Sequence, residues 1–552
     1  MKKTLSALFF ILISLAVQAT HNRSGEITYR QIGDLTFEFT ITTYTREAST
    51  VDRPSLEIVW GDSSSTIVSR TVKTANFAPD IAQNVYMATH TYKGPSVYKI
   101  SLVDANRNEL VINIPSSVDV PFYVETVLVI NPLQGYNNSP VLGRSPIDVG
   151  CKGYAFVFNP GAYDPDGTDS LAYRLVKCKG AKGVDIPGYS FPTASKSFSL
   201  NPISGDLIWD APDKEGEYNI AFVIEEWRNN QLIGSVERDM QIRIGICDTT
   251  PLLIAPLTDV CVIAGNSVQF DVTGKGPKLH YISLTASGSP LINLANLAVF
   301  SAPKSGQGGT AGHFQWDTKC ANITRFPQWM VFKVTDVRSG ENYSDFKSAS
   351  IRVAGPAPKN LTLSPVGNAI TLHWDKNICN EAVGYKVYKR LGKFNGTIAC
   401  PCTTGVPAST GFSLVKTLKG YDNVNFTDDG DHLASATTYS YIVTAFYKDG
   451  AESCASDVQD FLTTVQDIKV NNLSVSIFPN PVNTSALLEI TGTEPAEQSA
   501  FSLTDLVGKE VFHVETIESK ITFERGNLSP GIYVYSVKSN ARVFAPGKLI
   551  IQ

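Results

Sequence analysis

Leu207-Ile-Trp-Asp-Ala-Pro212 and the following Tyr218-Asn-Ile-Ala-Phe-Val-Ile-Glu-Glu226 give the clearest indication of the fold. The same pattern returns as Phe314-Gln-Trp-Asp-Thr318 and Trp329-Met-Val-Phe-Lys-Val-Thr-Asp336. Short apolar runs separated by turn signals favour strands, and no long segment shows the 3.6-residue apolar period of a helix. We therefore predict an all-β protein in which one sandwich unit occurs twice in tandem.

The match between the two copies extends beyond these strands. Three further positions correspond: Phe222 with Phe332, Glu226 with Asp336, and Arg228 with Arg338. Cys151 and Cys261 also lie at similar places near the start of each copy. The segment Asn131 to Pro146 is rich in Asn, Pro and Gly and is typical of a linker. We assign the first copy to residues 136–247 and the second to residues 248–354.

The segment upstream of the repeat, residues 20–135, also alternates like half-buried strands. In Leu35-Thr-Phe-Glu-Phe-Thr-Ile41, alternation places Phe37, Phe39 and Ile41 on one face. The order Trp60-Gly-Asp-Ser63, His90-Thr-Tyr92 and Tyr98-Lys-Ile-Ser-Leu-Val-Asp104 resembles a PKD-type immunoglobulin-like sandwich. The stretch His21-Asn-Arg-Ser-Gly-Glu-Ile-Thr-Tyr29 is similar to the start of large surface proteins associated with gliding motility.

Residues 355–466 resemble a fibronectin type III module. Ile370-Thr-Leu-His-Trp374 supplies an inward tryptophan, and Gly384-Tyr-Lys-Val-Tyr-Lys389 supplies the next strand. Thr437 and Tyr439, with Leu433 before them, have the spacing of a tyrosine corner, in which the hydroxyl bonds to nearby backbone. An insertion between Leu391 and Gly411 holds Cys400 and Cys402, and a loop of this length is either stapled or functional.

The last segment, residues 472–552, carries three short motifs. They are Ser474-Val-Ser-Ile-Phe-Pro-Asn-Pro481, Leu503-Thr-Asp-Leu-Val-Gly-Lys509 and Leu528-Ser-Pro-Gly-Ile-Tyr533. Together they resemble the C-terminal sorting domain of proteins exported by the bacterial type IX secretion system. Seven residues carry the match: Pro479, Asn480, Pro481, Gly508, Lys509, Gly531 and Tyr533. The resemblance implies that the folded tail binds the type IX translocon and that processing or anchoring machinery then acts on it.

The other end of the chain predicts a signal peptide over residues 1–19. Lys2 and Lys3 form a basic start, Leu5 to Val17 is apolar, and Val17-Gln-Ala19 supplies a cleavage signal. The expected location is therefore secreted or at the outer-membrane surface. The net charge of −5 becomes −7 once the two lysines are removed, and this acidity argues against a nucleic-acid partner.

Nine cysteines in an exported chain favour structural disulfides over metal or redox chemistry. Cys151 and Cys178 flank one strand-rich stretch, Cys261 and Cys320 flank another, and four more fall in the third: Cys379, Cys400, Cys402 and Cys454. This grouping leaves Cys247 over. Spacing alone does not give the connectivity.

The best set of candidate ligands is Asp164-Pro-Asp-Gly-Thr-Asp-Ser-Leu171, because calcium binds several oxygens and clustered carboxylates supply them. The segment resembles the Asp-x-Asp-Gly-Asp motif of cadherin-like repeats, with Thr168 inserted before the third acid. The resemblance would make Asp164, Asp166 and Asp169 ligands, with Glu225 or Glu226 on the later strand completing the site. The alternative is a turn held by Asx hydrogen bonds, with solvated acids. The second copy has Thr273-Gly-Lys-Gly-Pro277 in the corresponding region, so an ion would belong to the first copy alone.

Signatures of catalysis are missing from the sequence. It contains neither a G-x-S-x-G nor an H-E-x-x-H motif, and its seven histidines are scattered. Trp227 and Arg228 are weaker candidates for binding a glycan, and the alternative is a tryptophan that covers the end of the sandwich.

The predicted fold is a series of tandem immunoglobulin-like β-sandwiches followed by a small C-terminal β-sandwich sorting domain. The predicted function is a non-catalytic surface protein with an adhesive or spacer role, associated with gliding motility by resemblance. Its partners would be the secretion machinery and surface glycans or other surface proteins. The alternatives are a glycan-binding accessory protein and, third, a secreted hydrolase.

Overall fold

The computed structural model describes most of the chain from Asn22 onward. The expected signal peptide and His21 lie outside the described residues. The described ranges are 22–49, 52–167, 169–247, 252–292, 296–338, 341–366, 369–429, 433–434, 437–463, 474–491, 499–539, 542–543 and 547–552. The chain divides into two compact units, Met1–Ala354 and Gly355–Gln552. Strands dominate both units, which confirms the predicted all-β class with tandem sandwiches.

The first unit begins with seven strands and one 3₁₀ turn: β1 (Asn22–Gly33), β2 (Thr36–Arg46), β3 (Ser55–Val59), β4 (Ser65–Ala78), β5 (Ile81–Thr91), β6 (Val97–Asp104), η1 (Ser117–Asp119) and β7 (Phe122–Val129). The predicted alternation is confirmed, because Phe37, Phe39 and Ile41 are all buried in one core. Trp60 lies in the same core and stacks on His90 with ring centroids 4.8 Å apart.

A 3₁₀ turn, η2 (Pro132–Gln134), precedes the first copy of the repeat. The first copy contains nine strands and one 3₁₀ turn: β8 (Val141–Leu142), β9 (Ile147–Cys151), β10 (Phe156–Phe158), β11 (Ala162–Tyr163), β12 (Ser170–Val176), η3 (Ala181–Gly183), β13 (Ala194–Leu200), β14 (Leu207–Pro212), β15 (Gly216–Arg228) and β16 (Gln231–Gly245). The second copy contains β17 (Leu253–Ile254), β18 (Val260–Ile263), β19 (Ser267–Lys275), β20 (Tyr281–Gly288), α1 (Ser289–Ile292), β21 (Val299–Ser301), β22 (Gly306–Gln307), β23 (Gly309–Asp317), η4 (Cys320–Asn322), β24 (Gln328–Arg338) and β25 (Glu341–Ala354).

The strands of the two copies pair in corresponding ways. In the first copy β12 pairs with β15, β15 with β16, and β9 runs parallel to β16. In the second, β20 pairs with β24, β24 with β25, and β18 runs parallel to β25. Cys151 lies on β9 and Cys261 on β18, so the two cysteines occupy equivalent strands.

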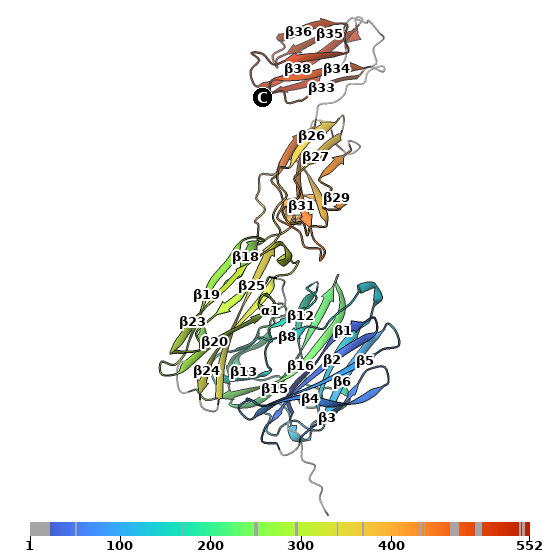
Figure 1. Cartoon of the computed structure of the whole chain (residues 1–552). Helices are drawn as coiled ribbons and strands as arrows, with labels where there is room; N and C mark the ends of the chain where they lie inside the picture. Colours follow the sequence, from blue (N-terminus) through green and yellow to red (C-terminus); the bar gives the residue numbers. More distant parts are fainter. Residues whose placement is uncertain are drawn as a thin grey trace, which may run out of the picture. The chain divides into compact units, whose positions relative to one another are not determined.

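One large sheet runs through all three segments of this unit (Figure 1). β16 of the first copy pairs with β1 and with β7 of the N-terminal segment, and β9 also meets β25 of the second copy. The sequence predicts neighbouring sandwiches but does not reveal that they share a sheet, because the pairing joins residues far apart in the chain.

Buried charged pairs join the N-terminal segment to the first copy. Arg107 and Asp239 are both fully buried and lie 2.6 Å apart, and Arg238 contacts Glu26 at 2.7 Å. A buried ion pair loses solvation on both sides, so it is stable only where its geometry and remaining hydrogen bonds are satisfied. Asp239 meets this condition in part, because its other oxygen accepts a hydrogen bond from Asn219 at 2.9 Å.

The second unit begins with seven strands and one 3₁₀ turn: β26 (Thr362–Val366), β27 (Ala369–His373), β28 (Gly384–Leu391), η5 (Ala408–Thr410), β29 (Ser413–Lys419), β30 (Asn425–Asp428), β31 (Thr438–Phe446) and β32 (Gln459–Leu462). They form two sheets, β26-β27-β30 and β29-β28-β31-β32. The predicted inward tryptophan, Trp374, is fully buried. The hydroxyl of Tyr439 accepts a hydrogen bond from the backbone N–H of Ala434 at 2.9 Å, as the tyrosine-corner spacing predicts.

Eight cysteines form disulfides, and the pairing corrects the sequence-based grouping. Cys247, expected to be left over, is bonded to Cys151 across 96 residues. The free cysteine is Cys178, buried beside the Arg107–Asp239 pair. Spacing failed here because β9 and the end of β16 meet only through their parallel pairing. In the predicted insertion Cys400 is bonded to Cys454, so that loop is stapled.

The chain closes with eight strands in two sheets: β33 (Ser474–Phe478), β34 (Ser485–Thr491), β35 (Ser499–Thr504), β36 (Glu510–Thr516), β37 (Lys520–Glu524), β38 (Gly531–Ser539), β39 (Arg542–Val543) and β40 (Gly547–Ile551). Their inward side chains form a separate apolar core that includes Leu488, Phe501 and Leu549. Within the described part of the chain, no helix has the length and apolar character needed to span a membrane.

Candidate metal centre

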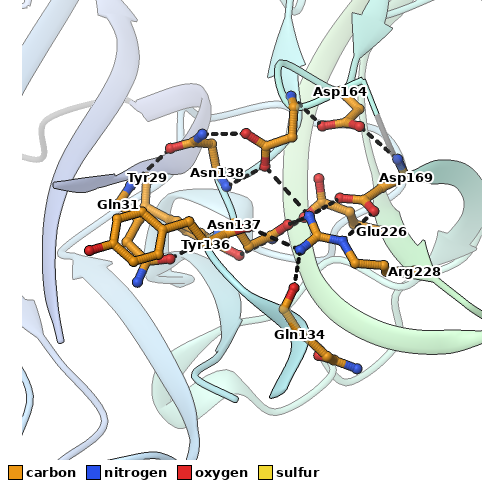
Figure 2. A network of polar contacts seen from close by, with 11 residues as sticks. Tyr29, Gln31, Gln134, Tyr136, Asn137, Asn138, Asp164, Asp169, Glu226 and Arg228 are labelled. Atoms are coloured by element: carbon orange, nitrogen blue, oxygen red, sulfur yellow. Dashed lines mark hydrogen bonds and ion pairs between the residues drawn. The ribbon is translucent and has the colours of Figure 1, made fainter. Parts of the chain in front are cut away.

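The acidic residues singled out in the sequence come together at one end of the first copy (Figure 2). Asp164, Asp166 and Asp169 lie on the loop between β11 and β12, and one carboxylate oxygen from each lies within 4.8 Å of the others. Glu226 lies near the end of β15, opposite Leu171 of β12. The pairing of β12 with β15 therefore brings the fourth carboxylate to the acidic loop.

The acidic loop is an Asx-stabilised turn. Asp164 accepts hydrogen bonds from the backbone N–H groups of Asp166 and Asp169, each at 2.8 Å. Gly167 has a φ of 72°, a conformation that favours glycine at this point of the turn. The turn expected as the alternative to a metal site is thus present, and it is also what gathers the three carboxylates.

Glu226 is the unusual member of the group, because it is fully buried. Its Oε2 accepts a hydrogen bond from the side-chain amide of Asn137 at 2.6 Å, while its Oε1 is buried and has no hydrogen-bond partner. A buried carboxylate oxygen with no partner costs free energy, and buried charges in proteins are normally paired or bound to a metal.

One cation of the protein itself, Arg228, lies at the edge of this group. Its guanidinium contacts Asp169 through two hydrogen bonds of 2.7 and 2.6 Å and lies 3.7 Å from Asp166. The same guanidinium donates to the carbonyl oxygens of Gln134 at 2.7 Å and Tyr136 at 3.0 Å. The group therefore contains four carboxylates and one guanidinium.

The pKa values of the carboxyl groups reflect this imbalance. Burial raises the pKa of Asp164 to about 7, with a further contribution from the charge of Asp169. Burial also raises the pKa of Asp166, and it raises that of Glu226 well above the ordinary value, where the charge of Asp164 adds to the effect. A divalent cation among these oxygens would relieve both the loss of solvation and the mutual repulsion.

The predicted linker supplies residues that the sequence reasoning missed. Asn138 donates its backbone N–H to Asp166 at 2.8 Å and accepts the backbone N–H of Gln31 at 2.9 Å. Asn137 contacts Glu226 on one side, and its amide oxygen accepts from Arg228 at 2.8 Å. The neighbouring asparagines were visible only as linker composition, yet they join β1 of the N-terminal segment to the acidic loop (Figure 2).

The donor set fits calcium. Calcium takes six to eight oxygen ligands and tolerates irregular geometry, and four carboxylates can supply most of them. A cavity of about 290 Å³ beside the loop, lined by Asp164 and Asp169 among others, offers a way in for an ion and its waters. The unpartnered Oε1 of Glu226 is the atom that such an ion would satisfy.

The two candidate glycan-binding residues, Trp227 and Arg228, have different surroundings. Trp227 is half-buried on β15, where it pairs with Ser170. Arg228 is held by Asp169, Asn137 and two backbone carbonyls, so its guanidinium is engaged within the protein.

The sorting-motif residues lie in the C-terminal domain, and Asn480 makes the most specific contacts. Its amide donates to the carbonyl oxygen of Lys548 at 2.9 Å and its side-chain oxygen accepts from the N–H of Ile550 at 2.8 Å. The hydroxyl of Tyr533 donates to the carbonyl of Ser529 at 2.9 Å. Gly508 has a φ of 90° in the turn before Lys509, a backbone conformation that side chains rarely adopt.

Comparison with solved structures finds proteins built from repeated β-sandwich domains. The crystal structure of domains A168–A170 of titin is 14% identical, covers 59% of this chain and 99% of its own, and has a TM-score of 0.19. The FN1–FN3 domains of chicken CNTN1 are 14% identical, with coverages of 55% and 98% and a TM-score of 0.18. These TM-scores are too low to carry an argument, so the fold rests on the strands described above. A search of curated proteins found no significant match to the chain.

A family model gives the positive result at the C-terminus. Residues 476–552 match the family described as the secretion system C-terminal sorting domain. The match covers β34 to β40 and contains the Pro-Asn-Pro, Gly-Lys and Gly-Ile-Tyr motifs. It implies export, a location at the cell surface or outside the cell, and interaction with the secretion machinery. The C-terminal segment of this chain is thus a type IX secretion system sorting domain, joined to tandem β-sandwiches.

Proposed function

We propose that this protein is a non-catalytic, exported protein with an adhesive or spacer role, in which a calcium ion fixes the junction between the N-terminal segment and the first sandwich copy. The observation that carries the proposal is the fully buried Glu226, whose Oε1 has no hydrogen-bond partner beside three further carboxylates. Asp164, Asp166, Asp169 and Glu226 are the proposed ligands.

The location of the acidic group supports a mechanical role for the ion. Asn137 and Asn138 contact the acidic group on one side and β1 on the other, so an ion bound there would hold a junction rather than a substrate. Surface modules exposed to the medium bind calcium with Kd values of roughly 10⁻⁴ to 10⁻³ M, which suits an exported protein. Calcium would then order the junction only outside the cell.

The experiment is a thermal unfolding series on the full chain after treatment with chelator. Calcium chloride should raise the Tm of the wild type by a few degrees, since a hundredfold excess over Kd adds ~2.7 kcal/mol to the stability of the folded state. Glu226→Gln should abolish the calcium-dependent shift. Asp336→Asn changes the equivalent position of the second copy and should leave the shift intact.

Magnesium chloride is the ion control, because magnesium demands a smaller octahedral site and gives up its waters reluctantly. The calcium hypothesis fails if the wild type shows no calcium-specific shift, or if Glu226→Gln responds like the wild type.

Export is tested separately by comparing culture fractions from cells that make the full chain with cells that make a chain ending at Val470. We expect only the full chain on the surface or in the medium. Normal export of the shortened chain would show that the sorting domain is dispensable for this protein.

A further inference from the structure

A second site lies in the first unit, away from the acidic loop. It is a cavity of about 450 Å³ whose lining combines residues of the N-terminal segment and both sandwich copies. Six of the lining residues matter for its chemistry: Arg23, Phe77, Arg144, Asp148, Lys333 and Thr335. The volume falls within the range of about 300–1,000 Å³ that is usual for small-molecule sites.

Arg144 is the distinctive residue of this cavity. Its Nε donates to Ser287 Oγ at 2.8 Å, its Nη1 to Thr285 Oγ1 at 3.0 Å, and its Nη2 to the carbonyl of Val331 at 3.3 Å. All three acceptors are neutral, and none of the described carboxylates forms an ion pair with this guanidinium. Burial lowers the pKa of Arg144 to about 10, so it still carries its charge at neutral pH.

Two other cations of the lining are paired with carboxylates of the protein. Arg23 pairs with Glu217 at 2.7 Å, and Lys333 pairs with Asp148 at 2.6 Å. The charge of Asp148 acts on Arg144, but its Oδ1 already accepts hydrogen bonds from Lys333 and Ser344. A half-buried guanidinium set among neutral acceptors is therefore available to an anionic ligand, and arginine matches the planar geometry of a carboxylate.

The remaining lining indicates the rest of the ligand. Phe77 lines the cavity and is 37% exposed, so it offers an apolar surface. The hydroxyl groups of Ser145 and Thr335 also line the cavity and can exchange hydrogen bonds with ligand hydroxyls. A carboxylate, an apolar ring face and several hydroxyls are the features of an acidic sugar.

We propose that this cavity binds a carboxylated saccharide, with Arg144 pairing with the carboxylate and Phe77 covering one face of the sugar ring. The proposal goes beyond the calcium-stiffened spacer and does not depend on it, because the two sites share no residue. It would give the adhesive role a ligand class, the uronic-acid units of acidic polysaccharides.

The test is isothermal titration of the full chain with sodium glucuronate, in buffer that contains calcium. Glucose serves as the neutral sugar, acetate as the bare carboxylate and inorganic phosphate as the generic anion. We expect glucuronate to bind, and to bind more tightly than each of the three controls. Arg144→Gln should weaken glucuronate binding at least about tenfold, the loss expected for a charge-assisted hydrogen-bonded pair.

Two further variants separate binding from folding. Phe77→Ala should weaken glucuronate binding while leaving the weak binding of acetate unchanged. Arg174→Gln removes an exposed arginine that pairs with Glu225 and lies outside the cavity, so it should bind like the wild type. Circular dichroism of each variant checks that it is folded, and Arg144→Lys replaces Arg144→Gln if the latter is not.

Several results would overturn the proposal. Equal binding of glucose and glucuronate would remove the role of the carboxylate, and phosphate binding as tight as glucuronate would reduce the site to a general anion site. Undiminished binding by folded Arg144→Gln would place the ligand elsewhere. Glucuronate binding that persists in Glu226→Gln is expected, which keeps this test separate from that of the calcium site.

Discussion

The two sandwich copies share a core but differ at one buried acid. Trp209 and Trp316 are both fully buried, and each donates its indole N–H to a backbone carbonyl, Thr193 at 2.9 Å and Asn296 at 2.8 Å. This anchor is the same in both copies. The two copies therefore keep one buried anchor although their sequences differ.

At the end of the equivalent strand the copies diverge. Glu226 lies opposite Leu171 and Asp336 lies opposite Ile282, and both carboxylates are fully buried. In the second copy the ring of His280 contacts Asp336 at 2.9 Å. His280 lies two residues before Ile282, and Asp169 lies two residues before Leu171, so His280 occupies the position that corresponds to Asp169.

The same count puts Lys275 at the place of Asp164. The second copy therefore pairs its buried carboxylate with a histidine, whereas the first gathers further acids around it. A buried acid can thus be stabilised by a basic side chain of the protein, as at Asp336, or by an ion from solution, as we propose for Glu226.

The largest effect is expected from the shared core. Trp209→Ala and Trp316→Ala should each lower the free energy of unfolding by about 3–5 kcal/mol, because each removes a large side chain and leaves a cavity. Urea unfolding followed by circular dichroism measures both. A loss below about 1 kcal/mol in one copy alone would show that the two cores are not equivalent.

The disulfide of the first copy comes next. Replacing Cys151 and Cys247 together by serine should cost about 2–4 kcal/mol, since the bridge closes a loop of nearly the whole copy. Cys178→Ala is the matched control, because this cysteine is buried and free, and it should cost about 1 kcal/mol or less. A similar cost for both changes would mean that the bridge itself adds little.

A substitution in the acidic loop can make the surroundings of Glu226 more like those of Asp336 in the second copy. Asp169→His places an imidazole where His280 stands in the second copy and removes one proposed calcium ligand. At a hundredfold excess of calcium over Kd, a bound ion would add ~2.7 kcal/mol to the stability of the wild type. We expect this gain, and the rise in Tm that reports it, to be near zero in the variant. A retained calcium response would show that Asp169 serves Arg228 alone.

The smallest effect concerns a buried acid that the second copy lacks. Glu237 of β16 corresponds to Phe346 of β25 in the second copy. Glu237 pairs with Val223 of β15, and Phe346 pairs with Lys333 at the equivalent position of β24. Burial raises the pKa of Glu237 to about 7, although Lys179 opposes the shift and the charges of Glu125 and Asp239 add to it.

A carboxyl with a raised folded pKa holds its proton more tightly when the protein is folded. Its contribution to stability is therefore full below pH 4.5 and is lost as the pH rises through about 7. Relative to Glu237→Gln, the wild type should lose about 1–2 kcal/mol between pH 5 and 7 in urea unfolding. Parallel pH profiles of the two proteins would contradict this assignment, and Glu225→Gln on the neighbouring strand is the control.

The sequence revealed what depends on local pattern. Alternation at Phe37, Phe39 and Ile41 predicted a strand face, and the Trp-Asp repeat predicted two equivalent units. The acids of the loop at Asp164 were adjacent in sequence, so their clustering was also predictable. Motifs of a few residues identified the sorting domain in the same way.

What the sequence did not reveal depends on contacts between distant residues. Arg107 meets Asp239 across 132 positions, and nothing local to either residue indicates the pair. The bond between Cys151 and Cys247 follows from a parallel strand pairing, and the role of Asn137 follows from the way the linker folds back on β15. The cavity at Arg144 is built from three segments and has no sequence signature of its own.

The contacts of Asn480 have a consequence for how the export signal is carried. This asparagine opens the sorting domain, yet both of its hydrogen bonds go to β40, 68 and 70 positions further along the chain. A short peptide copied from either end would leave those bonds unmade. We therefore expect that grafting the signal onto another cargo requires the whole folded domain, with its first and last strands together.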